Sequence, residues 1–252
     1  MSDALTGWIY SVLLFSLRVA PVFAFAPPFT LVRTPILFRV LFALGVSACV
    51  IGSAPTPAIS GGAGPGVLAT LAGRELLLGT IFVLGFQLAF GALQFAGRTV
   101  DIQAGFGMAT LMDPSTRTQM PLVGTILAYA AGAIFFAADG HVELLRILAA
   151  SLQTIPLGTH HFPTTLDPLL AFVSVAFVTA MGVVGGTVLA LFIADLAIAL
   201  LSRTVPQMNV LVLGFQVKTL LLLVALPVTL GVSGALLARL MRITVEMVPG
   251  LV

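Results

Sequence analysis

Ionisable side chains stand at a few places in an otherwise apolar chain: Arg18, Arg74, Glu75, Asp195 and Lys218. A charge within hydrocarbon costs several kcal/mol on most scales, so such a residue usually has a partner. Asp195 and Lys218 lie 11 and 12 residues on either side of Pro206, which stands near a predicted turn. Equal distances from a turn predict similar depths, so the two charges are able to pair with each other or with a neighbouring subunit. A proton relay at Asp195 is the weaker alternative.

Arg74 and Glu75 open a predicted helix, where the carboxylate of Glu75 complements the positive end of the helix dipole. Two interpretations remain open for this pair. It marks the interfacial start of a spanning segment, or it contacts another subunit.

A second polar set recurs every seven residues at Gln87, Gln94 and Asp101, which places the three side chains on one helix face. One interpretation is a polar stripe facing a pore or a subunit seam. The other is an ordinary set of hydrogen bonds between helices.

The sequence contains no recognisable catalytic or metal-binding pattern. His141 begins no zinc-protease motif, because Leu145 stands where the second histidine is required. His160 and His161 lie beside prolines without a cysteine or carboxylate at ligand spacing. The phosphate-binding G-x-x-x-x-G-K loop and the G-x-S-x-G elbow are also missing from the sequence. We therefore predict no catalytic residues, no metal and no cofactor. The one cysteine, Cys49, is interpreted as a small buried hydrophobe.

The stretch from Arg98 to Pro121 is too short, too polar and too rich in turn residues to cross a bilayer. Yet it holds large apolar groups among its glycines, and methionine fills irregular gaps well. We predict a loop that packs into an enclosed space within an assembly; a plain connector is the alternative. The residues assigned to this loop site are Gly105, Phe106, Gly107, Met108, Leu111, Met112, Asp113 and Pro114.

Composition decides the class of protein. The 252 residues are 59% hydrophobic and 8% charged, with a mean hydropathy of +1.17, whereas a soluble domain has about 25% charged residues. The net charge of +2 is too small to indicate a nucleic-acid partner. The sequence predicts a single all-α membrane domain over 1–252, with the first apolar segment retained as a membrane helix rather than cleaved as a signal.

Six apolar segments, judged against the roughly 20 residues needed to span a bilayer, are expected to be helical. They cover about 5–26, 36–51, 67–97, 122–138, 169–201 and 210–240. The tandem prolines Pro27-Pro28 are expected to end the first. Basic residues are divided too evenly between the connections to fix an orientation in the membrane.

Several separated motifs carry a family resemblance. "VDIQAGFGMATLMDP" at Val100–Pro114 resembles the signature loop of the FliR family, the R subunit of the flagellar type III export gate. The stretches that agree with it are "FAPPFTLVRTPILFRVLFALG" at Phe25–Gly45, "GRELLLG" at Gly73–Gly79 and "VPQMNVLVLGFQVK" at Val205–Lys218. The related SctT subunits of virulence secretion carry a different loop around Asp101, which favours the flagellar branch.

The resemblance implies a role and partners. Residues 1–200 resemble the P subunit of the gate, with a plug loop at 98–121, and about 169–240 resemble the two-helix Q subunit. Gln207, Asn209 and Lys218 belong to the Q-like part and are assigned to subunit contacts. The implied assembly is a helically wound gate with FliP and FliQ, beside FlhB and FlhA, in the lipid of the bacterial inner membrane at the flagellar basal body. It passes unfolded flagellar proteins.

Two other classes of protein were weighed against this one. A secondary transporter, the first alternative, needs internal repeats and broken helices around a site at the midplane, and no clear half-to-half repeat is visible. An intramembrane enzyme is disfavoured by the missing catalytic patterns.

Overall fold

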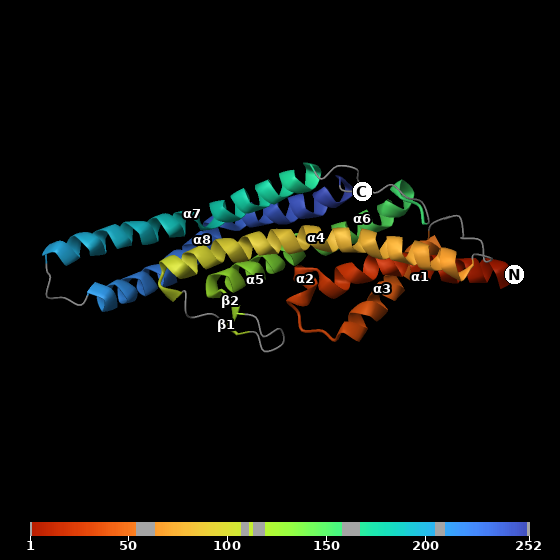
Figure 1. Cartoon of the computed structure of the whole chain (residues 1–252), viewed down its shortest axis with the longest axis horizontal. Coiled ribbons are helices and arrows are strands. Elements are labelled where there is room, and N and C mark those ends of the chain that lie inside the picture. Colours follow the sequence, from red (N-terminus) through yellow and green to blue (C-terminus); the bar gives the residue numbers. More distant parts are fainter. Residues whose placement is uncertain are drawn as a thin grey trace. The chain divides into compact units, whose positions relative to one another are not determined.

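The computed structural model describes residues 2–53, 64–106, 111–112, 119–157, 167–204 and 210–250. Over these residues the chain is almost entirely helical (Figure 1), which confirms the predicted all-α class. The helices are α1 (Ser2–Phe25), α2 (Pro27–Thr30), α3 (Ile36–Ser53), α4 (Pro65–Gln103), α5 (Leu122–Ala137), α6 (Gly140–Thr154), α7 (Asp167–Thr204) and α8 (Val210–Gly250). Two strands of two residues each, β1 (Leu111–Met112) and β2 (Gln119–Met120), pair antiparallel. No pattern in the sequence predicts this pairing.

Among the described residues, five helices are long and apolar enough to cross a membrane, namely α1, α3, α4, α7 and α8, and α5 with α6 forms a sixth candidate span. The prediction of a polytopic membrane protein with about six apolar helices is therefore confirmed. The helices α4, α7 and α8 contain 39, 38 and 41 residues. At 1.5 Å per residue each is about 57–62 Å long, roughly twice the thickness of the hydrocarbon core.

The predicted start of the loop at Arg98 is wrong, because α4 continues through Gln103. Its buried face continues too, with Val100 and Ala104 fully buried. The polar residues in this turn were taken for loop, but they occupy a helix whose other face is packed.

The chain divides into two compact units that each combine separate stretches of sequence. The first contains Met1–Leu88, Asp139–Phe172 and Arg242–Val252, and the second contains Ala89–Ala138 and Val173–Met241. The prediction of one membrane domain with P-like and Q-like parts concerns resemblance to other subunits, and it stays a prediction.

In the first unit, α1 packs against α3 and ends at Pro27-Pro28, as predicted. Prolines have no N–H, so carbonyls at the end of α1 lose their helical donors. Side chains replace them: Arg39 Nη1 donates to the Ala24 carbonyl at 3.0 Å, and Gln87 Nε2 donates to the Phe25 carbonyl at 2.9 Å. Side chains of α3 and α4 thus donate the hydrogen bonds that the carbonyls at the end of α1 lack.

In the second unit, α4 and α5 approach closely where two glycines meet. A Cβ placed on Gly97 would lie 2.2 Å from Gly124 Cα, which is much closer than two non-bonded carbon atoms can approach. Glycine is therefore required at this crossing, as small residues commonly are where membrane helices touch.

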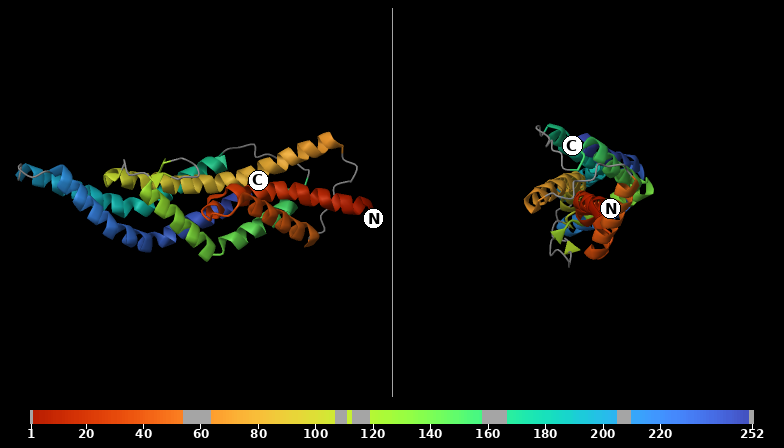
Figure 2. Two further views of the ribbon diagram at one scale, coloured as in Figure 1. Left: turned by 90° about the horizontal axis from the view of Figure 1, so that it is seen from below. Right: turned by 90° about the vertical axis from the view of Figure 1, so that its right-hand side faces the viewer.

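The helices α7 and α8 form an antiparallel hairpin in the second unit (Figures 1 and 2). Polar contacts hold it at intervals. Ser233 Oγ donates to the Val183 carbonyl at 3.0 Å, the hydroxyls of Thr187 and Thr229 are hydrogen-bonded, and Lys218 pairs with Asp195. Successive contacts lie further along α7 and further back along α8, as expected for an antiparallel pair.

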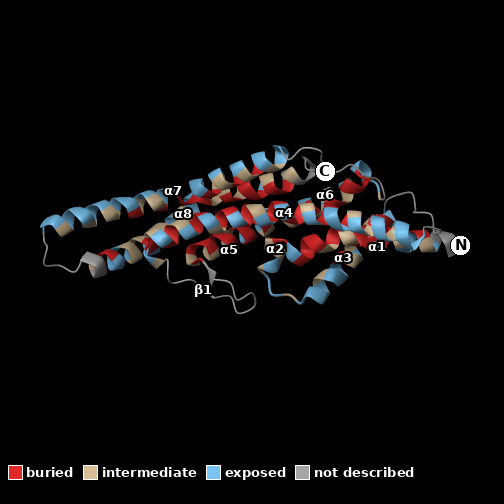
Figure 3. Ribbon diagram, in the orientation of Figure 1, coloured by how far each residue is buried: buried red, intermediate tan, exposed pale blue. Residues whose placement is uncertain are grey.

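Burial differs sharply between helices (Figure 3). In the most apolar window of each span, 61% of α1 and 56% of α4 is buried, but only 17% of α3 and 22% of α7 and α8. Cys49 lies on the poorly covered α3 and is exposed, so the prediction that it is buried is wrong for this chain by itself. The sequence could not show which apolar faces the chain leaves uncovered.

Candidate functional site

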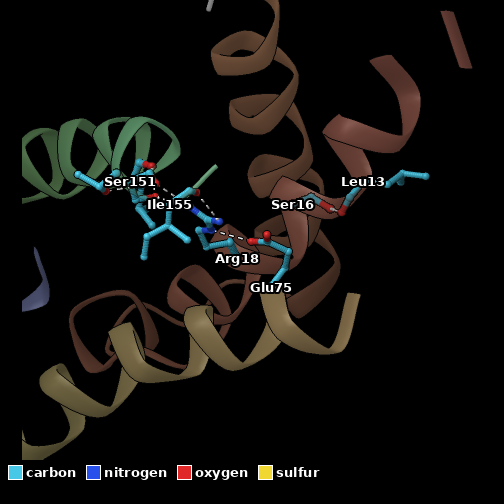
Figure 4. Close-up of polar contacts among 8 residues, drawn as sticks. Leu13, Ser16, Arg18, Glu75, Ser151 and Ile155 are labelled. Carbon is cyan, nitrogen blue, oxygen red and sulfur yellow. Dashed lines mark hydrogen bonds and ion pairs between the residues drawn. The ribbon is translucent and has the colours of Figure 1, made fainter. Parts of the chain in front are cut away.

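A buried arginine joins three helices in the first unit (Figure 4). Arg18 of α1 is 0% exposed, and its Nε donates to Glu75 Oε2 of α4 at 2.7 Å. Its Nη1 donates to the carbonyl and hydroxyl oxygens of Ser151 at 3.1 and 2.9 Å, and its Nη2 donates to the Ile155 carbonyl at 3.1 Å. We call Arg18, Glu75, Ser151 and Ile155 the arginine cluster.

Arg18 of the arginine cluster both donates to carbonyls at the end of a helix and pairs with a buried carboxylate. Ser151 and Ile155 lie at the C-terminal end of α6, where the helix dipole is negative. The Ser151 carbonyl also accepts from the Ile155 N–H, whereas the Ile155 carbonyl lies beyond the last helical hydrogen bond. A guanidinium supplies several N–H groups in a rigid fork that suits such an arrangement. The carboxylate of Glu75 balances the charge, so the pair is tolerated away from water.

The predicted placement of Glu75 at the start of a helix is wrong. The helix begins at Pro65, and Glu75 lies well inside α4 with 2% of its surface exposed. Its carboxylate therefore serves Arg18 rather than a helix dipole. Its neighbour Arg74 is half-buried on the same helix, and a subunit contact for Arg74 and Glu75 stays a prediction.

A second charged cluster lies in the second unit, where α4 ends against the hairpin. Lys218 Nζ of α8 forms an ion pair with Asp195 Oδ1 of α7 and donates to the Gln103 carbonyl, the last of α4, at 3.2 Å. Gln103 Nε2 in turn donates to the Val188 carbonyl of α7 at 3.1 Å. We call Gln103, Val188, Asp195 and Lys218 the lysine cluster. The two charges placed at matched depth by the sequence are thus in contact.

A glycine with a left-handed backbone conformation directly follows the lysine cluster. Gly105 has a φ of +88°, a backbone conformation that favours glycine and is common where helices end. The ring of Phe106 then packs edge-on against Phe215 of α8, with 5.7 Å between ring centroids. The predicted loop therefore leaves α4 along α8.

At the other end of the loop, Asp101 is hydrogen-bonded to the start of α5. Its side chain is buried, and the backbone N–H of Val123 donates to its two carboxylate oxygens at 3.2 and 3.3 Å. Val123 lies in the first turn of α5, whose N-cap residue Pro121 makes no capping hydrogen bond through its side chain. A carboxylate from α4 thus provides the N-terminal cap that the sequence of α5 lacks.

The three residues of the predicted polar stripe have different surroundings. Gln87 is exposed in the first unit and donates to the carbonyl of Phe25 at the end of α1. Gln94 is half-buried and Asp101 is buried, and both lie in the second unit. The contacts of Gln87 and Asp101 are hydrogen bonds between helices, which was the second interpretation of the pattern. A role beside a pore or a subunit seam stays a prediction.

Part of the predicted site lies outside the described residues. This is true of Gly107, Met108, Asp113, Pro114, Gln207 and Asn209. For Leu111 and Met112 the structure describes the backbone, which forms β1. Over the described ranges, no group of three or more His, Cys, Asp or Glu side chains is placed to hold a metal ion.

Ser151 and Ile155 were missed by the sequence analysis, because they act through backbone and hydroxyl groups that carry no distinctive pattern. Arg18 was recognised as an unusual charge, but its partners lie 57, 133 and 137 positions away. Only the tertiary fold brings them together.

Comparison with known proteins places this arrangement in context. Residues 9–243 match the family described as bacterial export proteins, family 1. The chain is 31% identical over 181 residues to the flagellar biosynthetic protein FliR of Bacillus subtilis (strain 168), covering 70% of each chain. It is 30% identical to the flagellar biosynthetic protein FliR of Escherichia coli (strain K12), over 68% of this chain and 62% of that protein.

Similarity extends to virulence secretion. The Yop proteins translocation protein T of Yersinia pestis is 31% identical over 60% of this chain and 59% of its own length. The matched stretches therefore span between 59% and 70% of these three relatives. The arginine and lysine clusters both lie inside the family match.

Proposed function

The chain belongs to family 1 of the bacterial export proteins, and from this premise we propose that it is a structural channel subunit of a flagellar type III protein export gate. In this role it has no catalytic activity and passes unfolded flagellar proteins across the bacterial inner membrane. The observation that carries the proposal is the family match over residues 9–243, reinforced by relatives named for flagellar biosynthesis and Yop translocation.

The uncovered helices support a role inside a larger assembly. Large apolar side chains are exposed along both arms of the hairpin, including Val178, Phe192 and Leu196 on α7, and Leu220, Leu223 and Val232 on α8. Apolar patches of this kind mark interaction with lipid or protein. Because these helices are about twice as long as the hydrocarbon core is thick, lipid tails cannot cover them over their whole length. Other subunits supply the remaining cover, for which FliP and FliQ, with FlhB and FlhA nearby, are the proposed partners.

We further propose that residues 105–121 form a plug in the closed channel, with Phe106, Met108, Leu111 and Met112 as its apolar filling. About seventeen residues is long for a connection in a compact protein, and such loops usually carry function. The left-handed conformation of Gly105 supports this proposal, because it ends α4 and begins the loop. The described ends of the loop are both held by hydrogen bonds to neighbouring helices.

Purification tests the subunit role. The full chain, expressed with its neighbouring small membrane proteins, is isolated in mild detergent and weighed by native mass spectrometry. We expect a hetero-oligomer that contains unlike subunits. A monomer or homo-oligomer that transports a small solute would instead establish the secondary transporter.

A further inference from the structure

The lysine cluster joins three helices at the point where the loop begins. We propose that Lys218, with Asp195 as its counter-ion, is a positioning residue that fixes the end of α4 on the α7–α8 hairpin and so sets where the loop starts. This deepens the proposed function and rests on it for one consequence only, that the positioned loop is a plug.

The contacts of Lys218 are those expected of a helix-ending cation. The last four carbonyls of a helix have no intrahelical donor, and a positive charge there also complements the dipole. Lys218 Nζ reaches the Gln103 carbonyl at 3.2 Å while paired with Asp195. An ammonium group has three donors, so it serves both partners at once. One side chain thus connects the end of α4 to both arms of the hairpin.

Aromatic packing extends the same attachment by one turn. Phe215 and Lys218 are three residues apart on α8 and share a face. They contact Phe106 and Gln103, which are also three residues apart and run in the opposite direction. The first residues after α4 therefore lie against α8 through two successive contacts, one polar and one aromatic.

The two ends of the loop are held by different elements. The outgoing end is attached to α8 through Lys218 and Phe215, whereas the returning end is capped by Asp101 of α4 itself. The contacts of the outgoing end therefore depend directly on the hairpin, whereas the contact at the returning end lies between α4 and α5. This geometry makes the hairpin the element that positions the loop.

The ion pair between Lys218 and Asp195 is expected to position the loop rather than to stabilise the folded chain. The side chains of Lys218 and Asp195 are 19% and 40% exposed, so the pair is only partly shielded from its surroundings. Half-exposed ion pairs contribute little to stability. Replacing Lys218 is therefore expected to leave the hairpin folded, because its other polar contacts, such as Ser233 with the Val183 carbonyl, are independent of it.

Cysteine cross-linking in membranes that contain the full chain tests the inference. On a Cys49→Ser background, Phe106→Cys with Phe215→Cys reports the start of the loop, and Thr187→Cys with Thr229→Cys reports the hairpin. Removing both phenylalanines leaves the contacts of Lys218 and the hydrogen bond from Gln103 to Val188 as the attachment that the first pair reports. The measured quantity is the rate of cross-linking by a short bifunctional thiol reagent.

We expect Lys218→Met to slow cross-linking of the loop pair by roughly tenfold, because its effective concentration falls once the attachment is lost. The hairpin pair should cross-link as before. Lys218→Arg, which keeps the cation, should restore the loop pair. Arg242→Met is the matched control, because it breaks an exposed ion pair with Glu246 on the same helix and should change neither rate.

Three results would overturn the inference: an unchanged loop pair in Lys218→Met, an equal loss in both pairs, or no recovery with Lys218→Arg. The assay measures position and needs no open channel, so it is independent of the plug. If Lys218→Met slows only the loop pair while a chain lacking the loop stays impermeable, Lys218 positions the loop but the plug proposal fails.

Discussion

The arginine cluster and the lysine cluster have the same plan and opposite surroundings. Each uses one cation, paired with one carboxylate, to serve the terminal carbonyls of a helix and join three helices. The side chains of Arg18 and Glu75 are 0% and 3% exposed, whereas those of Lys218 and Asp195 are 19% and 40% exposed. The same arrangement of hydrogen bonds therefore occurs once among buried side chains and once among partly exposed side chains.

This difference predicts different consequences for each cluster. Breaking a buried pair leaves an uncompensated charge away from water, which destabilises the fold strongly. Breaking a half-exposed pair costs little, because the remaining charge finds other partners. We infer that the arginine cluster maintains the first unit, while the lysine cluster sets the position of a loop at small cost to stability.

The largest effect is expected from Arg18→Met. It leaves Glu75 buried without a cation and removes the hydrogen bonds that Arg18 donates to two carbonyls at the end of α6, so we expect a loss of about 3–5 kcal/mol. The measurement is the amount of chain recovered from membranes and its midpoint of thermal aggregation in detergent. Arg146→Met, which breaks an exposed pair with Glu143, should change stability by no more than about 0.5 kcal/mol. Equal losses in both variants would remove the contrast between buried and exposed pairs.

The next largest effect is expected at the close contact between α4 and α5. Gly97→Ala places a Cβ 2.2 Å from Gly124 Cα and should force α4 and α5 apart, at a cost of about 1–3 kcal/mol. Gly91→Ala is the matched control on the same helix, because no atom lies within 4 Å of its added Cβ. The control should be neutral or stabilise the helix by up to about 1 kcal/mol. Thermal aggregation of the two variants, measured side by side, decides whether the crossing is as tight as described.

A smaller effect is expected where the loop returns. Asp101→Ala removes the carboxylate that accepts the N–H of Val123 and caps α5, which should cost about 0.5–2 kcal/mol. Asp101→Asn keeps one accepting oxygen and should lose less. Proteolysis in detergent, followed at the start of α5, measures the fraying. If Asn and Ala behave alike, the carboxylate is not acting as a cap.

The smallest change in stability is expected from Lys218→Met, about 0.2–1 kcal/mol for the chain alone. Its effect should appear in assembly, because Asp195 is left unpaired wherever another subunit covers the hairpin. Recovery of the complex with its partner subunits, relative to the recovery of the chain alone, is the quantity to measure. Normal yield and normal stability of that complex would contradict a role for this pair in the assembled gate.

The sequence predicted the lysine pair but not the arginine cluster, and the reason is geometric. Asp195 and Lys218 lie on two helices joined by one turn, so counting residues from Pro206 is enough to match their depths. Arg18 and its partners lie on helices that are not neighbours in the sequence, so no count relates them. Hydropathy located the apolar helices, because it depends only on residues that are neighbours in the sequence. It could not show which apolar faces other helices cover.

The end of α4 was misjudged for a related reason. Hydropathy falls at Arg98, which led to a predicted loop from that residue, although α4 continues to Gln103. The seven-residue spacing of Gln87, Gln94 and Asp101 already required a helix that reaches Asp101. Periodicity was the better guide here, because a helix with one buried face tolerates polar residues on the other.

The most direct test of the proposed plug is the conductance of a gate whose loop has been shortened. Residues 107–118 are replaced by a short Gly-Ser linker, which keeps the attachments of Phe106 and Asp101, and the chain is expressed with its partner subunits. A complex of normal composition that leaks ions across the membrane, where the unaltered gate is tight, is the result we predict. An intact complex that remains as tight as the unaltered one would contradict the plug and return residues 105–121 to the role of a connector.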